Sequence, residues 1–187
     1  MRLFILDVET QGLDPKQHKI LEFAAVVYHV ETKKILASYQ QVLHASSNPV
    51  AEINGLTEEV LAESALVHCN VGFAENLSAD CDAFVAHHAP FDHGFLNARG
   101  SRLVLADKPW ICSKADLKFS KNDQAKDKKL TSLAKAHGIA TVDAHSALGD
   151  VLMVVALLQT LEPAELVQQV RGALVKLELE NKKLEVR

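Results

Sequence analysis

The chain is poor in three features that mark whole classes of protein. Only 5% of its 187 residues are aromatic, which argues against a long platform of stacked bases. Its three cysteines, Cys69, Cys81 and Cys112, are far apart and form no CxxC pair, so neither a disulfide framework nor a thiolate zinc site is indicated. Basic residues are not in excess either: 20 Lys and Arg against 24 Asp and Glu give a net charge of -4, which excludes a general polycation.

Long apolar runs are also missing. The longest, residues 20–28 (broken by Glu22) and 151–158, fall well short of the ~20 residues that a membrane span needs. The apolar segment at the N-terminus is interrupted by acids before any small-residue cleavage site. We therefore expect a cytoplasmic protein with no membrane partner.

The composition of the chain and the order of its predicted elements are typical of a protein with one compact core. Hydrophobic residues make up 48% of the chain and charged residues 24%, which are globular proportions. Three β-rich runs open the chain, and shorter strands and helices then alternate. The predicted strands are residues 2–8, 20–30, 34–44, 83–86 and 109–112, and the predicted helices are residues 57–63, 67–80, 91–98, 130–137 and 144–161. This order indicates an α/β fold in which helices cover a sheet.

Two segments allow more than one interpretation. Residues 114–129 hold six lysines against three aspartates and predict a mobile surface loop, which is either a solvated linker or a rim that attracts phosphate. Residues 163–187 combine a helical spacing with a strict alternation around Asn181, and we interpret them as a helix to Gly172 followed by a hairpin. The predicted division is thus a domain over residues 1–162 and an appendage over residues 163–187.

The first chemical signal is a pair of acids at the carboxyl end of the first predicted strand. Asp7 and Glu9 are two residues apart, so they project to the same face with backbones roughly 6 to 7 Å apart. Two such carboxylates repel each other unless a cation neutralises them, and hard oxygen ligands suit Mg²⁺ or Mn²⁺. For such a pair on its own, a strand end that frays into solvated acids is the commoner explanation.

Two further acids have distinctive surroundings. Asp92 follows a short strand and a turn with His87 and His88, where it opens a helix and complements the helix dipole. Asp150 stands among apolar residues five positions after His145, and a lone acid in such company needs a partner. The histidines at 87, 88 and 93 lack the further ligands that a zinc site requires.

Joined in order, these segments resemble the DEDDh family of 3′-to-5′ exonucleases. The first family motif corresponds to Asp7, Glu9, Thr10, Gly12 and Leu13; the second to His87, His88, Phe91, Asp92, Phe95 and Leu96; and the third to His145 and Asp150. His88 stands where the family usually has asparagine, which bears on substrate preference more than on chemistry. The resemblance covers residues 1 to about 160 and does not include the tail.

The resemblance implies a fold and a mechanism. The fold is ribonuclease H-like, a mixed five-stranded sheet with helices on both faces. Two Mg²⁺ (or Mn²⁺) ions would be held by Asp7, Glu9, Asp92 and Asp150, and would polarise the phosphodiester. His145 would be the general base, since histidine titrates near neutral pH and can accept a proton from the attacking water. The products would be nucleoside 5′-monophosphates, released stepwise from a free 3′ end.

The resemblance also indicates the substrate side of the site. The residues that would contact the terminal nucleotide are Thr10, Gly12, Leu13, His88 and Phe91, although a phenylalanine beside a helix start, such as Phe91, more often belongs to the core. Single-stranded DNA is the expected substrate. An exoribonuclease, or a silent nucleic-acid-binding module on the same fold, remains as an alternative. A homodimer or a polymerase partner is left open.

Overall fold

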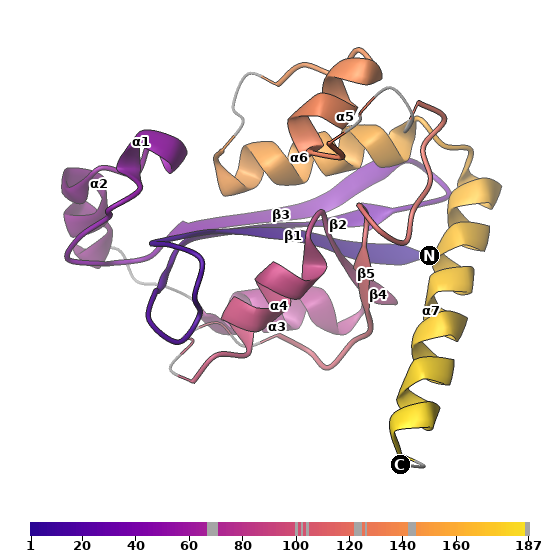
Figure 1. Ribbon diagram of the computed structural model, residues 1–187, viewed down its shortest axis with the longest axis horizontal. Helices are drawn as coiled ribbons and strands as arrows, with labels where there is room; N and C mark the ends of the chain where they lie inside the picture. The colour runs from indigo at the N-terminus through magenta and orange to yellow at the C-terminus, as the bar shows by residue number, and fades with distance from the viewer. Residues whose placement is uncertain are drawn as a thin grey trace.

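The sheet is the framework of the molecule. The computed structural model describes residues 1–66, 71–99, 101, 103, 105–121, 125, 127–141 and 145–185. Its strands are β1 (Arg2–Thr10), β2 (Ile20–His29), β3 (Lys34–Val42), β4 (Ala83–Ala86) and β5 (Trp110–Cys112). They lie side by side in the order β3-β2-β1-β4-β5, with β1 to β3 antiparallel and with β4 and β5 parallel to β1 (Figure 1). The predicted mixed five-stranded sheet is confirmed.

Helices cover both faces of this sheet. They are α1 (Ala51–Asn54), α2 (Glu58–Glu63), the 3-10 turn η1 (Ser64–Leu66), α3 (Val71–Ala79), α4 (Ala89–Leu96), α5 (Leu130–Ala136), α6 (Ala147–Gln159) and α7 (Pro163–Glu185). Figure 1 shows α5 and α6 on one face, and α3 and α4 on the other. The chain therefore folds as a three-layer α/β structure.

Side chains along β1 alternate between the two faces of the sheet. This alternation divides the core into two clusters and decides which face the acids at the end of the strand share. Leu3 and Ile5 pack into the cluster under α6, whereas Phe4 and Leu6 pack into the cluster under α3 and α4. Because alternate side chains of a strand share a face, Asp7 and the residue two further on continue the row of Leu3 and Ile5. The apolar row toward α6 thus ends in carboxylates at the carboxyl end of the strand.

Local signals in the sequence explain several helix ends. Thr57 caps α2 by accepting a hydrogen bond from the backbone N–H of Val60 at 3.3 Å, as its position predicts. Gly138, with φ +72°, follows α5 in the left-handed conformation that glycine adopts freely. Ser146 caps α6 through the N–H of Gly149.

Some predictions fall partly outside the described residues. Of the helix predicted over residues 67–80, the structure describes Val71–Ala79 as helical, and residues 67–70 lie outside the described residues. The helix predicted over residues 144–161 likewise has its first residue, 144, outside them. Residues 122–124 and 126 of the predicted loop over 114–129 also lie outside the described part of the chain.

The prediction of a hairpin near the C-terminus is wrong. The helix α7 does not stop at Gly172 but continues to Glu185. Leu166 and Val170 are buried against the core, which anchors the first turns. Further along, Val175 and Leu179 of the alternating residues are each 55% exposed, so a strand there would bury little apolar surface. An isolated two-stranded hairpin is marginal in water, whereas a helix bonds its own backbone groups and can extend from an anchored start.

No single helix among the described residues is both long and apolar enough to cross a membrane. The helices α6 and α7 reach that length and composition only as a pair, and they are bent by 113° relative to each other.

The packing of α6 generates the first testable prediction. Leu158 lies on α6 and is fully buried in the core, so Leu158→Ala should lower the free energy of unfolding by about 2 to 5 kcal/mol. Leu152 lies on the same helix but is 43% exposed, and Leu152→Ala is the matched control with a change of about 0.5 kcal/mol or less. Urea unfolding followed by circular dichroism measures both. Equal losses in the two variants would contradict this packing.

Candidate active site

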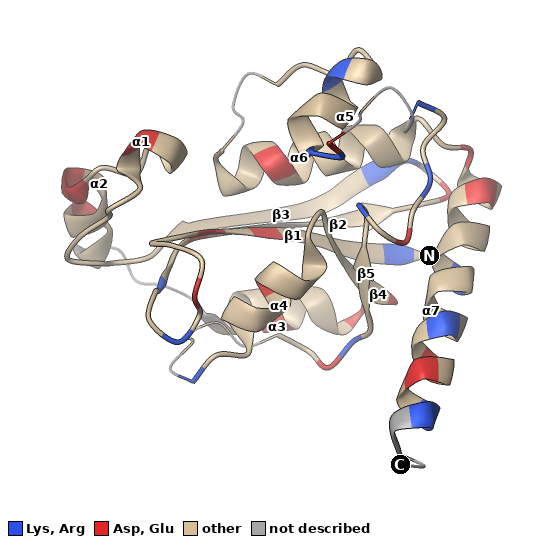
Figure 2. Cartoon of the chain, in the orientation of Figure 1, with Lys and Arg blue, Asp and Glu red and all other residues tan. Residues whose placement is uncertain are grey.

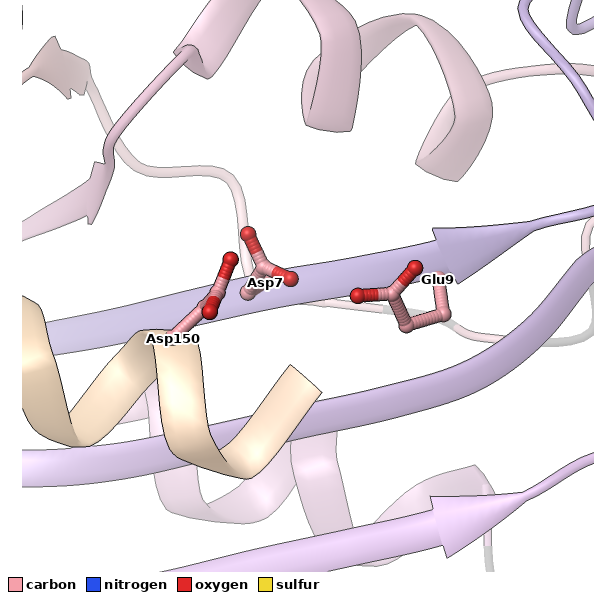
Figure 3. Close-up of side chains that lie close together, drawn as sticks. All are labelled: Asp7, Glu9 and Asp150. Carbon is pink, nitrogen blue, oxygen red and sulfur yellow. The ribbon is translucent and has the colours of Figure 1, made fainter. Parts of the chain in front are cut away.

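Three carboxylates from two elements converge at the end of β1. Asp7 and Glu9 lie on β1, and Asp150 lies in the first turn of α6. Each contributes one oxygen, and these three oxygens all lie within 4.8 Å of one another. Figure 3 shows the three side chains directed toward a common point between the strand and the helix. The structure thus brings together three of the four acids that the sequence predicts.

The fourth acid, Asp92, adjoins this group from α4. Its side chain is only 2% exposed, and its Oδ1 accepts a hydrogen bond from the backbone N–H of Val8 at 3.2 Å. That bond ties the first turn of α4 to β1 between the two acids of the strand. Asp92 is outside the set of three close oxygens, yet its charge is near enough to raise the pKa of Asp7. The site therefore has a close trio and one deeper acid beside it.

The electrostatics of this cluster are unfavourable without a cation. Burial, and then the charges of Asp92 and Asp150, raises the pKa of Asp7 well above its ordinary value. Burial, followed by the charge of Asp150, raises the pKa of Glu9 to about 8. Burial also raises the pKa of Asp92 to about 7, although the N–H of Val8 opposes this rise. None of the ion pairs found among the described residues involves these four acids. A donor set of clustered carboxylate oxygens fits a hard divalent cation.

Sequence reasoning missed a fifth acid, Glu22. It faces Glu9 across the β1–β2 pair and is 2% exposed. Its Oε1 accepts a hydrogen bond from Gln40 Nε2 at 2.6 Å, and its Oε2 accepts one from the backbone N–H of Ala147 at 2.9 Å. Glu22 thus fixes the first turn of α6, which carries Asp150. The available signal was a single acid inside the apolar run of residues 20–28.

His145 lies immediately before α6 at the exposed edge of the cluster. Its backbone N–H donates a hydrogen bond to Asp150 Oδ1 at 3.2 Å. Burial raises the pKa of Asp150, while this N–H and the imidazole of His145 both oppose that rise. The φ of His145 is +70°, a left-handed conformation that is uncommon for a residue with a Cβ. The predicted general base is therefore adjacent to the acid cluster and open to solvent.

The turn after β1 presents the next group of predicted residues. Thr10 is buried, and its Oγ1 donates a hydrogen bond to the carbonyl oxygen of Gly12 at 2.7 Å. A Cβ at Gly12 would approach the ring of His18 to 2.8 Å, so a larger residue there would require the His18 ring to shift. Leu13 is 84% exposed. The turn closed by the hydrogen bond from Thr10 to Gly12 is thus followed directly by an apolar side chain exposed to solvent.

His88 and Phe91 lie at the start of α4, on the same helix as Asp92. Their rings are parallel, with an interplanar angle of 8° and centroids 6.3 Å apart. His88 is exposed, whereas Phe91 is partly buried and packs against Phe95 with centroids 4.9 Å apart. Phe91 therefore belongs to the edge of the core and also supports the exposed histidine.

The neighbouring His87 has a structural role. It is buried, its Nδ1 lies 3.0 Å from Ser113 Oγ, and its Nε2 lies 3.0 Å from the carbonyl oxygen of Lys128. Burial lowers its pKa. Both ring nitrogens are thus engaged with protein groups, which leaves neither for a metal ion.

Comparison of the sequence with known proteins identifies the family. The model of the Exonuclease family (RNase T) matches residues 4–158. The chain is 36% identical over 100 residues to the DNA polymerase III subunit epsilon of Rickettsia typhi, covering 52% of this chain and 43% of that one. It is 30% identical over 155 residues to the PolC-type DNA polymerase III of Thermotoga petrophila, covering 78% of this chain and 11% of that one. The chain thus spans less than half the length of these relatives.

Solved structures share the fold. Exonuclease X in complex with 5′-overhanging duplex DNA has a TM-score of 0.58 and 22% identity, covering 83% of this chain and 88% of that one. The nuclease domain of 3′hExo, a DEDDh family member bound to rAMP, has a TM-score of 0.65 and 19% identity, covering 87% of this chain and 94% of that one. The chain belongs to the exonuclease family, and both the resemblance to the DEDDh exonucleases and the ribonuclease H-like fold are confirmed.

The raised pKa values generate a prediction about pH. The folded-state pKa values of Glu9 (about 8) and Asp92 (about 7) exceed the values of about 4 expected in the unfolded chain. Between about pH 5 and about pH 8 the folded chain therefore binds more protons than the unfolded chain, so the stability of the metal-free protein should fall as pH rises. Calorimetric Tm values in EDTA measure this fall, and excess Mg²⁺ should remove it.

The control for this prediction is the double variant Glu9→Gln/Asp92→Asn. It retains every other titrating group, including His87, whose lowered pKa acts in the opposite direction. Its metal-free Tm should fall less steeply with pH than that of the unaltered chain. If the Tm values of the two proteins fall equally steeply with pH, the raised pKa values of Glu9 and Asp92 are not the cause of the fall.

Proposed function

We propose that the chain is a divalent-metal-dependent 3′-to-5′ exonuclease. The observation that carries the proposal is the convergence of Asp7, Glu9 and Asp150, with Asp92 beside them, in a member of the exonuclease family. Buried carboxylates that repel one another persist when function requires them, and a cation offsets the repulsion.

Two Mg²⁺ or Mn²⁺ ions fit the donor set. The four carboxylates offer oxygen ligands only, and no described Lys or Arg is paired with them. When bound, the ions would neutralise the phosphodiester and stabilise the charge that develops on its oxygens. Glu22 would maintain the spacing of the ligands, because it holds the start of α6 against β2.

His145 would act as the general base. Its N–H bond to Asp150 keeps the residue beside the cluster, and its exposure lets the imidazole return a proton to solvent. It would accept the proton of the attacking water, and nucleoside 5′-monophosphates would leave one at a time.

Single-stranded DNA is the substrate that we propose. Leu13 and the parallel pair His88 and Phe91 would border the terminal nucleotide, with Thr10 and Gly12 holding the turn that carries Leu13. The relatives named DNA polymerase III favour DNA and a polymerase partner. RNA remains the second candidate, because the 3′hExo domain binds rAMP.

A labelled-strand assay tests this function. With Mg²⁺ or Mn²⁺, the chain should shorten single-stranded DNA from its 3′ end, and EDTA should stop the reaction. Asp150→Asn should weaken metal binding measured by calorimetry and lower turnover by about a hundredfold or more, because one charged ligand is lost. Mismatched duplex and RNA in the same assay rank the substrates. Intact strands with every metal would favour the silent binding module instead.

Replacement of His145 tests the proton transfer. Turnover should fall by about 10² to 10⁴ in His145→Asn, because the amide cannot accept a proton near neutral pH. Asparagine tolerates the left-handed backbone at this position, so Tm and metal affinity should stay close to those of the unaltered chain. Equal turnover in the variant would remove His145 from the mechanism.

A further inference from the structure

A groove with basic walls lies on the α4 side of the molecule, away from the acid cluster. Its volume is about 400 Å³, and it is lined by the loop between β1 and β2, by residues after β3, and by the chain that leaves α4. Lys16, Lys19 and Arg99 lie on its walls, while the buried Leu43 and Phe95 contribute apolar surface. Figure 2 shows blue segments on this loop and just beyond the end of α4.

The positive charges of this groove are available to a ligand. Lys16, Lys19 and Arg99 are exposed, and in the described part of the chain none of them takes part in an ion pair. The nearest acid on the loop is Asp14. Its carboxylate is turned back to the loop, where it accepts hydrogen bonds from the backbone N–H of Lys16 at 2.9 Å and from Gln17 Nε2 at 2.8 Å. A protein of net charge -4 thus keeps a local cluster of cations, of which only Lys16 has its charge near that of Asp14.

Two elements connect the groove to the candidate active site. The loop that supplies Lys16 and Lys19 begins with the turn at Gly12, three residues after Glu9 of the acid cluster. The helix α4 carries Asp92 in its first turn and ends at Leu96, three residues before Arg99. The loop contacts this helix midway, since a Cβ at Gly94 would lie 3.8 Å from Pro15 Cγ. The loop and the helix α4 therefore contact each other and together connect the groove to the candidate active site.

We propose that this groove binds the phosphodiester backbone of the same strand whose 3′ end occupies the active site. The inference rests on the proposed function. Because α4 and the loop after β1 join the groove to the cluster, a strand whose 3′ end lies at the cluster can place upstream phosphates in the groove. Lysine and arginine contacts to phosphate read no bases, so binding here is independent of sequence. The groove gives the enzyme affinity for polynucleotides beyond the terminal nucleotide.

Strand binding by a charge variant tests the groove directly. The variant is Lys16→Gln/Lys19→Gln/Arg99→Gln, and the probe is a fluorescent single-stranded DNA of about 20 nucleotides with phosphorothioate linkages at its 3′ end. Fluorescence anisotropy with Ca²⁺ in place of Mg²⁺ gives Kd across a salt series. We expect Kd to rise about tenfold or more at low salt. The slope of log affinity against log salt should fall by about 2, since each lost contact to a single strand removes about 0.7.

Two further variants separate charge from folding. Lys34→Gln/Lys182→Gln/Lys183→Gln removes the same charge from exposed lysines on β3 and α7, outside the groove, and should bind as the unaltered chain does. The charge-conserving Lys16→Arg/Lys19→Arg/Arg99→Lys should also retain binding. The inference is overturned if the groove variant binds within about twofold of the Lys34 control, or if the unaltered chain does not bind the strand at low salt.

A small substrate distinguishes failure of this inference from failure of the proposed function. The p-nitrophenyl ester of thymidine 5′-monophosphate reaches the acid cluster but has no upstream phosphates. If the unaltered chain does not hydrolyse this ester or any strand, the proposed exonuclease function fails, and the anisotropy result still decides whether the groove binds a backbone.

Discussion

The repulsion among carboxylates at the end of β1 is the constraint on which the rest of the site depends. Asp7 and Glu9 follow an apolar row on one strand, and Asp92 and Asp150 are brought against them by two helices from opposite faces of the sheet. Burial of several like charges lowers stability unless each is hydrogen bonded or neutralised. Among the described residues, carboxylates gather in this way at one place only, within the part of the chain that matches the exonuclease family.

Backbone amides hold the acids in place despite that repulsion. Asp92 accepts from the N–H of Val8, and Asp150 accepts from the N–H of His145. Glu22 contributes by accepting from the N–H of Ala147, so a buried acid on β2 anchors the helix that carries an acid of the cluster. Hydrogen bonds to ionised oxygens are stronger than neutral ones. The contacts that offset the repulsion therefore also set the geometry of the acids, so the protein's own backbone amides assemble the cluster.

Part of this arrangement could be predicted from local sequence. The period of two along residues 2–10 placed Asp7 and Glu9 on one face, because strand alternation needs no knowledge of the rest of the fold. The approach of Asp92 and Asp150 could not be derived in that way, since it depends on which helices pack on which face. Only the resemblance to a family joined them in advance.

Register and anchoring limited the prediction elsewhere. The contribution of Glu22 depends on pairing across strands, where it faces Glu9, and on the docking of α6. The continuation of α7 past Gly172 depends on the burial of Leu166 and Val170 by other parts of the chain. Both are tertiary effects, and a local pattern that suits a hairpin and a helix equally cannot choose between them.

The helix α4 shows how functional charges can agree with stability instead of opposing it. Its dipole places partial positive charge in the first turn, where Asp92 lies, and partial negative charge in the last turn, which ends at Leu96, three residues before Arg99. The acid that we propose as a metal ligand thus stabilises the helix that carries it, and the arginine that we propose as a phosphate contact follows the end of opposite polarity. Asp92 and Arg99 are seven residues apart and share no ion pair in the described part of the chain, so the proposed cation site and the proposed phosphate-binding groove can coexist in a chain with an excess of acids.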